Sequence, residues 1–191
     1  MKVVAFNGSA KKGGNTARLI QTVFSELHKA GVETELVELS GKNIHGCHAC
    51  GACGKNKNKK CAFDDDCVNE CISKMLAADG IVIGSPTYFA NASPEILSLM
   101  DRACYVARAN DDMFKHKVGA SVVAVRRAGA IHVFNSLNHF FFISQMIVPG
   151  SRYWNIGYGL QPGDVEKDRE AIATMEVLGQ NMAYLLRKLH A

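Results

Sequence analysis

The sequence lacks the long apolar runs that secretion or membrane insertion requires. Too few apolar residues follow Met1 for a secretory signal, and the longest later run, 140–148, is broken by Ser144 and Gln145. A transmembrane helix needs about 20 consecutive apolar residues. We therefore expect a cytoplasmic protein with no membrane partner, in a compartment that keeps thiols reduced.

Neither sign of charge is in large excess, since 22 Lys and Arg face 18 Asp and Glu, for a net charge of +4. One dense basic patch, at Lys55, Lys57, Lys59 and Lys60, has no interleaved aromatic residues. We expect a solvated loop or a docking face for an acidic redox partner, and no nucleic acid. Linkers, repeats and low-complexity segments are also missing, which predicts a single domain over 1–191.

Several familiar catalytic patterns are missing as well. No Ser–His–Asp set or paired carboxylates can be recognised. The first glycine-rich loop is not Gly-x-Gly-x-x-Gly, which argues against a dinucleotide-binding Rossmann site, and it lacks the Gly-Lys-Ser/Thr of a P-loop. We therefore predict no catalytic side chain and assign the chemistry to a cofactor.

What the sequence does contain is an alternation of buried strands and amphipathic helices. We expect strands at 3–6, 32–39, 81–84, 119–125 and 146–148, and helices at 15–30, 65–78, 93–108, 131–145 and 164–190. This order predicts an α/β fold, an open, doubly wound parallel sheet with helices on both faces. Ligands bind such sheets beyond the carboxyl ends of the strands, so the segments 8–16, 85–91 and 126–130 should converge on one site.

The loop after the first strand is suited to a phosphate group. Its candidate ligand-binding residues are Ser9, Lys11, Gly14, Asn15 and Thr16. Glycines let backbone N–H groups turn inward, hydroxyls and an amide add donors, and the start of the following helix favours an anion. Without a P-loop lysine, the loop fits a simple phosphomonoester such as the tail of FMN. An ordinary glycine-rich turn is the alternative.

Two further strand ends supply candidate cofactor contacts. They are Ser85, Pro86, Thr87, Tyr88 and Phe89 after the third strand, and Arg126, Arg127 and Gly129 after the fourth. An aromatic side chain could cover a flat ring system. A guanidinium could stabilise an anionic reduced flavin or bind a nicotinamide-nucleotide phosphate. As alternatives without a ligand, the aromatic side chains could simply pack in their loop, and the arginines could form surface ion pairs.

Four cysteines stand out in the loop insertion at about 41–63. Cys47, Cys50, Cys53 and Cys61 follow the pattern Cys-x2-Cys-x2-Cys-x7-Cys. In such a run the first three sulfurs can bind three irons of a cuboidal cluster, and the sulfur of the fourth cysteine can bind the remaining iron. Structural zinc and free thiols are the alternatives. Disulfides explain the pattern poorly, because the total of seven cysteines is odd.

Together these elements resemble the NADPH-dependent FMN reductases among the flavodoxin-like proteins, and within them the iron–sulfur flavoproteins. The matching segments are 8–16, the cysteine run as far as Asp65-Asp66, 78–80, 85–89, Asp101-Arg102 and 126–129. The resemblance implies a flavodoxin-like five-stranded sheet of order 2-1-3-4-5 in three α/β/α layers, with FMN held by 9–16 and 86–89. It also implies homodimers or homotetramers in which one subunit's [4Fe–4S] cluster approaches another's flavin.

The predicted function is that of an FMN-dependent oxidoreductase. FMN would receive electrons from NAD(P)H or a ferredoxin-like donor, and a [4Fe–4S] cluster at the four cysteines would pass them on. Three alternatives stay open: a non-enzymatic iron–sulfur electron carrier, a cluster-free FMN or quinone reductase, and a zinc-stapled scaffold with a vestigial nucleotide site.

Overall fold

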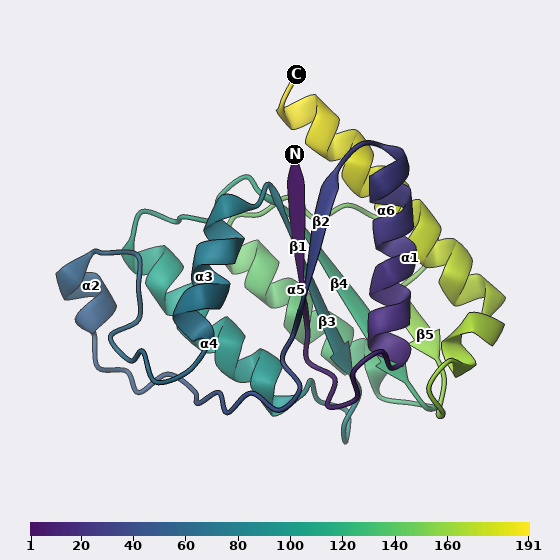
Figure 1. Cartoon of the computed structure of the whole chain (residues 1–191), viewed down its shortest axis with the longest axis horizontal. Coiled ribbons are helices and arrows are strands. Elements are labelled where there is room, and N and C mark those ends of the chain that lie inside the picture. The colour runs from purple at the N-terminus through teal and green to yellow at the C-terminus, as the bar shows by residue number, and fades with distance from the viewer.

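A parallel β-sheet forms the centre of the computed structural model, which describes residues 1–191 (Figure 1). Its five strands are β1 (Lys2–Asn7), β2 (Glu33–Glu38), β3 (Gly80–Pro86), β4 (Val118–Val125) and β5 (Ile156–Tyr158). They lie in the order β2-β1-β3-β4-β5, and every neighbouring pair is parallel. The strand order confirms the predicted flavodoxin-like α/β fold.

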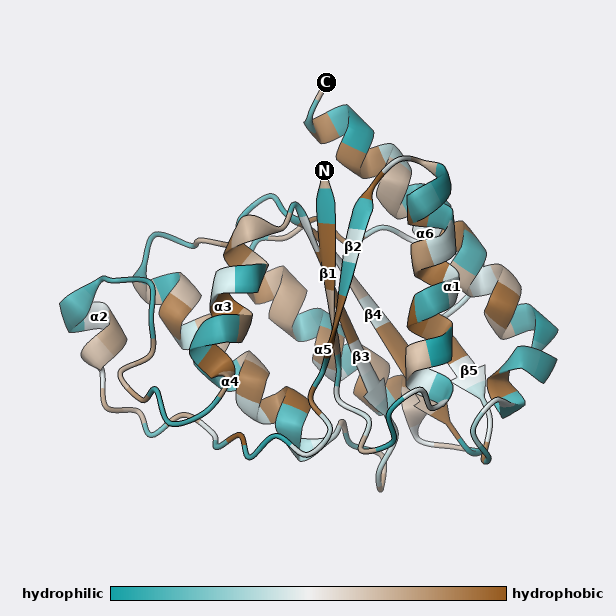
Figure 2. Cartoon of the chain, viewed as in Figure 1, coloured by the Kyte–Doolittle hydropathy of each residue, from teal (hydrophilic) through white to brown (hydrophobic).

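Helices cover both faces of this sheet. They are α1 (Asn15–Lys29), α3 (Val68–Ala77), α4 (Pro94–Ala109), α5 (Ala130–Ile143) and α6 (Arg169–Leu189), while the short helix α2 (Ala52–Asn56) lies beside α4. Alternation along β1 shows how the layers divide, because Val3 and Ala5 face one core cluster and Val4 and Phe6 face the other. The first cluster includes α1 and α6, and the second includes α3, α4 and α5. Figure 2 shows the corresponding apolar stripes on these helices.

The two helices of the first layer pack against each other unusually closely. A Cβ atom at Gly179 of α6 would lie 2.7 Å from the Val23 carbonyl oxygen and 2.7 Å from Glu26 Cβ of α1. A side chain at this point would force the two backbones apart, so glycine is required by the helix–helix distance.

None of the helices is both long and apolar enough to cross a membrane.

The predicted fifth strand at 146–148 is wrong. Only Ile147 pairs there, in an isolated bridge with Val118 near the start of β4. Pro149 follows, and because proline has no N–H it cannot extend the ladder. The chain returns to the same edge nine residues later, where Ile156 begins β5 opposite Val123.

The structure also differs from the sequence prediction at several other elements. The cysteine-rich segment contains a short helix, α2, at the end of the molecule farthest from α1 (Figure 1). The last helix begins at Arg169 rather than 164, after a 3-10 turn at Asp164–Lys167, and the Asp168 carboxylate accepts from Ala171 N–H at 3.1 Å. The helix expected at 65–78 begins at Val68.

Candidate functional site

The carboxyl ends of β1, β3 and β4 open into one groove with an empty volume of about 650 Å³. We call it the strand-end groove. It is lined by Ser9, Lys11, Gly14, Asn15, Thr16, Pro86, Thr87, Tyr88, Ala124, Val125, Arg126, Gly159, Leu160 and Pro162. The structure therefore brings together residues from all three segments that the sequence singled out.

The N-terminus of α1 faces this groove without a protein partner for its first N–H groups. Gly14 is the N-cap residue and supplies no side-chain cap, and the first turn has no acidic residue. The first N–H to find a helical acceptor is that of Arg18, which donates to the Gly14 carbonyl at 3.1 Å. Uncapped donors and the positive end of the helix dipole together form an anion site.

The loop leading into α1 is held in shape by its own side chains. Ser9 N–H donates to Asn7 Oδ1 at 3.0 Å, and Ser9 Oγ accepts from Lys11 N–H at 3.2 Å. The Asn7 amide is itself fixed, because Nδ2 donates to Glu38 Oε2 at 2.7 Å. The loop is therefore ordered by a chain of hydrogen bonds that does not use the N–H groups at the helix terminus.

Thr87 carries the clearest mark of a ligand site. Thr87 lines the groove, and its Oγ1 atom is buried and has no hydrogen-bond partner in the protein. The backbone here is satisfied, because Thr87 N–H donates to the Ala124 carbonyl at 2.8 Å. An unpaired buried hydroxyl costs about 1–3 kcal/mol. A bound polar ligand would supply the missing partner.

A tight turn follows Thr87 and forms the rim of the groove. Phe89 and Ala90 have φ values of 49° and 61°, and Tyr88 and Asn91 exchange backbone hydrogen bonds of 2.9 Å. Gly129, with φ of 87°, packs directly against this turn, since a Cβ there would lie 2.9 Å from Ala90 Cβ. Gly129 thus allows the two loops to approach closely.

Four of the candidate cofactor residues do not line the groove: Ser85, Phe89, Arg127 and Gly129. Ser85 is fully buried, and its Oγ donates to the Pro86 carbonyl and accepts from Ser93 N–H. Phe89 projects entirely into solvent. Arg126 does line the groove, whereas Arg127 is exposed outside it.

One wall of the groove was not anticipated from the sequence. It comes from Gly159, Leu160 and Pro162, in the loop after β5. Asn15 joins this loop to the helix terminus, because its Oδ1 accepts from Gly163 N–H at 2.8 Å. The density of glycine and proline in the stretch was the only available signal.

All four cysteines of the spaced motif line a second cavity, with an empty volume of about 660 Å³. We call it the cysteine cavity. Its lining consists of Cys47, His48, Ala49, Cys50, Gly51, Cys53, Cys61, Ala62, Phe63, Arg102, Tyr105 and Val106. The other three cysteines lie outside it, and burial raises the pKa of the Cys71 and Cys104 thiols.

The cysteine sulfurs can be compared with the geometry of a single metal ion. Only one set of three or more metal-ligating groups has all its ligand atoms within 4.8 Å of one another, and it contains no cysteine. Four sulfurs around one tetrahedral zinc ion, at 2.3 Å each, lie about 3.8 Å apart. No three of the cysteine sulfurs are therefore gathered as closely as the ligands of a single zinc ion.

Arg102 of α4 forms part of the cavity wall and is 1% exposed. Its Nε donates to Cys61 Sγ at 3.4 Å, its Nη2 donates to the Phe63 carbonyl at 2.9 Å, and its Nη1 pairs with Asp66. Burial by itself would lower the pKa of Arg102, but hydrogen bonds to Cys61 and Asp66 outweigh burial and raise it. The guanidinium is therefore a permanent buried cation beside one cysteine.

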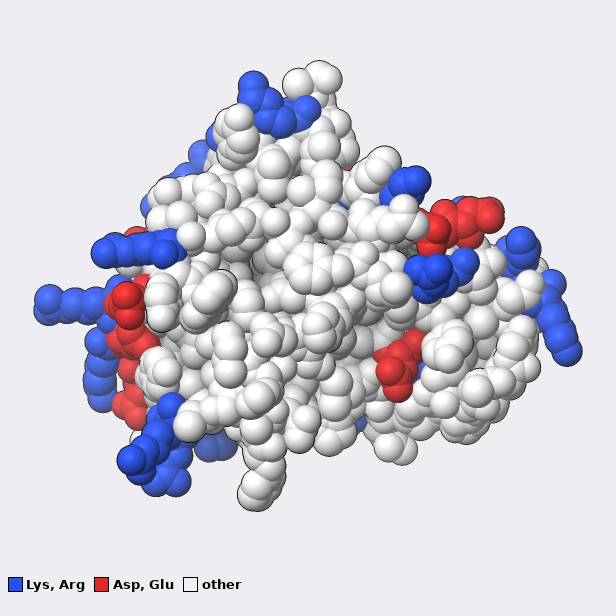
Figure 3. Space-filling model, turned by 180° about the vertical axis from the view of Figure 1, so that it is seen from behind, with Lys and Arg blue, Asp and Glu red and all other residues white.

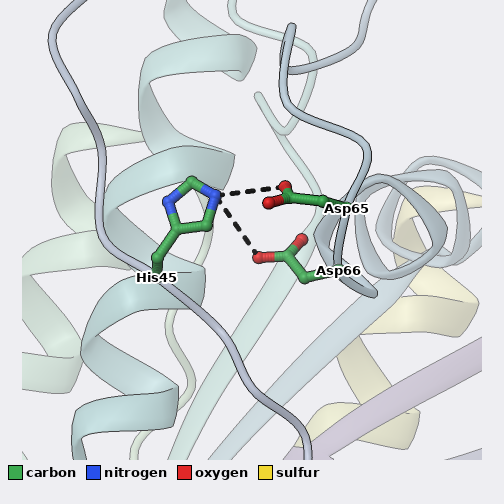
Figure 4. Close-up of side chains that lie close together, drawn as sticks. All are labelled: His45, Asp65 and Asp66. Carbon is green, nitrogen blue, oxygen red and sulfur yellow. Dashed lines mark hydrogen bonds and ion pairs between the residues drawn. The ribbon is translucent and has the colours of Figure 1, made fainter.

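The remaining cluster of metal-ligating groups is His45, Asp65 and Asp66 (Figure 4). His45 Nε2 points between the carboxylates, 3.4 Å from Asp65 Oδ1 and 3.8 Å from Asp66 Oδ2. Hydrogen bonds from its own backbone N–H and from His45 lower the pKa of Asp65. Because Arg102 already pairs with Asp66 and lies 3.3 Å from His45 Nε2, the guanidinium supplies the positive charge that a metal ion would bring.

A parallel sheet of order 2-1-3-4-5 is the flavodoxin-like fold, and here an uncapped helix terminus lies at its switch point. The chain is an FMN-dependent oxidoreductase, and it belongs to the NADPH-dependent FMN reductase family, whose model matches residues 1–161.

Curated relatives match the chain over nearly its whole length. It is 34% identical over 197 residues to an iron–sulfur flavoprotein of Methanocaldococcus jannaschii, covering 98% of each chain. It is also 32% identical over 189 residues to an iron–sulfur flavoprotein of Methanosarcina thermophila, covering 97% of this chain and 95% of that one.

Solved structures share the fold at lower identity. RosB, with a bound 8-demethyl-8-formylriboflavin-5'-phosphate intermediate, superposes with a TM-score of 0.74 at 19% identity over 100% of this chain and 80% of that one. An NAD(P)H:quinone oxidoreductase of Methanothermobacter marburgensis gives a TM-score of 0.69 at 12% identity over 95% and 98% of the two chains.

Proposed function

We propose that the protein is an iron–sulfur flavoprotein enzyme, with FMN in the strand-end groove and a [4Fe–4S] cluster in the cysteine cavity. Electrons would enter from NAD(P)H or a ferredoxin-like donor and leave to an acceptor protein or small molecule. The observation that carries the proposal is the convergence of Cys47, Cys50, Cys53 and Cys61 on one cavity, in a chain whose fold is that of an FMN protein.

The groove residues would hold FMN in a defined orientation. The free N–H groups at the start of α1 and the hydroxyls of Ser9 and Thr16 suit the phosphate. Thr87 Oγ1 would pair with a polar edge of the ring system, and Tyr88 would cover part of its face. When bound, FMN accepts two electrons as hydride and can release them singly.

Arg126 would give the groove its positive charge at the end of β4. It lines the groove, whereas its neighbour Arg127 does not. A guanidinium there would stabilise negative charge on a reduced flavin, or attract the phosphate of a pyridine nucleotide. Of the two arginines, we therefore assign the electrostatic role to Arg126 alone.

The cysteine cavity would hold the cluster through the four thiolates. Three sulfurs come from 47–53, a segment that leads into α2 through its N-cap residue Gly51, and the fourth comes from Cys61. Bound there, the cluster would accept and release one electron at a time. The exposed lysines at 55, 57, 59 and 60 lie beside this cavity, and they would attract an acidic electron-transfer partner.

Helix α4 connects the two sites. The N–H of its N-cap residue Ser93 donates to Ser85 Oγ. Ser85 directly precedes Pro86, which lines the groove. Arg102 and Tyr105, further along the same helix, line the cysteine cavity. Arg102 is nine residues after Ser93, a rise of about 14 Å along the helix. One rigid element would therefore keep the two redox centres at a fixed separation.

We also propose a homodimer or homotetramer. Seen from behind, the molecule has a broad central area without charged side chains, with charges toward its margins (Figure 3). Phe142 and Ile143 of α5 are exposed, although Phe140 and Phe141 beside them are buried in the chain's own core. Exposed apolar area of this kind favours self-association.

Anaerobic turnover assays would test the enzymatic part of the proposal. The holoprotein should oxidise NADH or NADPH and pass the electrons to an added acceptor, and removal of FMN should abolish this activity. A holoprotein that exchanges electrons with reduced ferredoxin but never oxidises NADH or NADPH would be an electron carrier instead.

A further inference from the structure

Cys61 is held differently from the other three cysteines of the cavity. Its N–H donates to Asn69 Oδ1 at 2.8 Å, and its carbonyl accepts from Asn69 Nδ2 at 3.1 Å. Asn69 belongs to α3 and is 7% exposed. The buried Asn69 amide therefore makes two hydrogen bonds to the backbone of Cys61 and fixes its position.

The Cys61 sulfur is fixed from a second helix. Arg102 of α4 donates from Nε to Sγ, and the rest of its guanidinium is held by Asp66 and the Phe63 carbonyl. The other sulfurs have weaker surroundings: Cys47 Sγ accepts from Ala49 N–H at 3.4 Å, and Cys53 Sγ lies 3.9 Å from the Tyr105 carbonyl. Among the four, only Cys61 has a charged hydrogen-bond donor.

We propose that Arg102 is a positioning residue that fixes the Cys61 thiolate and raises the reduction potential of the cluster. This inference rests on the proposed cluster. The reduced centre carries one more negative charge than the oxidised one, so a nearby buried cation and an N–H···S hydrogen bond stabilise it more. The guanidinium is shielded from solvent, which weakens screening by water and salt.

Arginine is specifically suited to this position. Its planar fork presents donors in fixed directions, so a single side chain can reach a sulfur, a carboxylate and a carbonyl at once. Lysine would keep the charge but not these three directions. Asp66 pairs with Nη1, whereas Cys61 is bound by Nε, and the carboxylate adds negative charge, so its removal should shift the potential in the opposite direction from removal of Arg102.

The test compares anaerobically prepared holoproteins carrying R102Q, R102K or D66N with the wild type and a control. The control is R108Q, which removes an equal charge from α4 at a residue that donates only to the Ile143 carbonyl, outside the cavity. Iron, acid-labile sulfide and FMN are counted first. The cluster potential is then measured by a dye-mediated redox titration monitored by electron paramagnetic resonance.

We expect R102Q to reduce the equilibrium constant for one-electron reduction at least tenfold, which is a fall of about 59 mV. R102K should fall between R102Q and the wild type, D66N should shift upward, and R108Q should not change. If R102Q does not retain the cluster while FMN stays bound, a selective loss of iron relative to R108Q also supports the inference.

Two results would overturn it, and they are distinguishable. Wild-type protein without iron contradicts the proposed cluster, and the inference fails with it. A wild-type cluster whose potential and iron content are the same in R102Q and R108Q contradicts the role of Arg102 alone. Should neither Arg102 variant fold, an unchanged potential in D66N would contradict the electrostatic effect.

Discussion

The strand-end groove and the cysteine cavity have similar volumes but are built in different ways. The groove is formed where β1, β3 and β4 end, and its anion-binding donors are backbone N–H groups at the start of α1. The cavity is formed largely by a segment whose only regular element is the five-residue helix α2. The geometry of the groove is therefore set by backbone groups and by the fold as a whole. The geometry of the cavity is set by a few side chains that hold an irregular segment in place.

Arg102 and Asn69 are two side chains that hold the segment around Cys61 to the rest of the molecule. They reach the cysteine segment from α4 and α3, which are anchored in the core beneath the sheet. Single substitutions should therefore affect the cavity more strongly than the groove. The following predictions test this difference, beginning with the largest effect.

Replacing any one of Cys47, Cys50, Cys53 and Cys61 by Ser should remove most or all of the iron and leave FMN bound. Each thiolate would occupy one corner of the cluster, and no other cysteine lines the cavity to replace it. Cys104→Ser is the control and should retain iron. Metal analysis together with the flavin absorption spectrum provides the readout, and equal iron in all the variants would contradict the ligand assignment.

The double variant Ser9→Ala/Thr16→Ala should weaken FMN binding about a hundredfold or more and leave riboflavin binding unchanged. Hydrogen bonds to a charged group contribute about 1.5–3 kcal/mol each, and only FMN carries the phosphate. Thr22→Ala/Ser25→Ala, on the exposed side of α1, is the matched control. Titration calorimetry with both ligands checks the result, and equal losses for the two would place the phosphate elsewhere.

Thr87→Val should weaken FMN binding by about tenfold without destabilising the apoprotein. It removes a buried hydroxyl that has no protein partner, so the apoprotein loses no hydrogen bond. Ser144, the other buried hydroxyl without a partner, lies outside both cavities, and Ser144→Ala should leave FMN affinity unchanged. A Thr87→Val protein with normal FMN affinity would exclude this hydroxyl from the flavin site.

The smallest effect is expected outside both sites, at the edge strand β2. Hydrogen bonds from Lys2 and Lys74 lower the pKa of Glu35. A lowered carboxylate pKa means that this contribution is present above the unfolded pKa of about 4.3 and is lost as pH falls through the folded value. Because these side chains are partly exposed, the loss should be below about 1 kcal/mol.

Thermal unfolding of Glu35→Gln at neutral and acidic pH would measure this contribution. The variant should be less stable than the wild type at neutral pH, and the difference should shrink in acid. Glu33→Gln, at a more exposed carboxylate of the same strand, is the matched control. A difference that grows as the pH falls would contradict the expected sign.

The strand-end groove could be predicted from the sequence more fully than the contacts around the cysteine cavity. The groove was predictable because the apolar run before Gly8 and the Ser93-Pro94 helix start specify where regular elements end, and parallel topology brings those ends together. The fifth strand was misplaced because Met146 to Val148 is as apolar as a strand, and only the later return of the chain at Ile156 shows which segment pairs with the end of β4.

Side-chain contacts across long sequence separations could not be predicted. The spacing of the cysteines pointed to a shared site, but nothing in it indicated that Arg102, 41 residues after Cys61, would donate to that sulfur. Likewise, Thr87 and Ser85 are similar hydroxyl residues in one short segment. Both hydroxyls are buried, but only Ser85 has the Pro86 carbonyl and the Ser93 N–H within hydrogen-bond reach, whereas Thr87 Oγ1 has no partner.

The most direct test of the central claim is the metal content of wild-type protein purified without oxygen. An FMN site in the groove and a [4Fe–4S] cluster in the cavity predict about four iron and four acid-labile sulfide per FMN, with no zinc. Protein that contains FMN together with about one zinc, or FMN with no metal, would contradict the cluster and leave a plain FMN reductase.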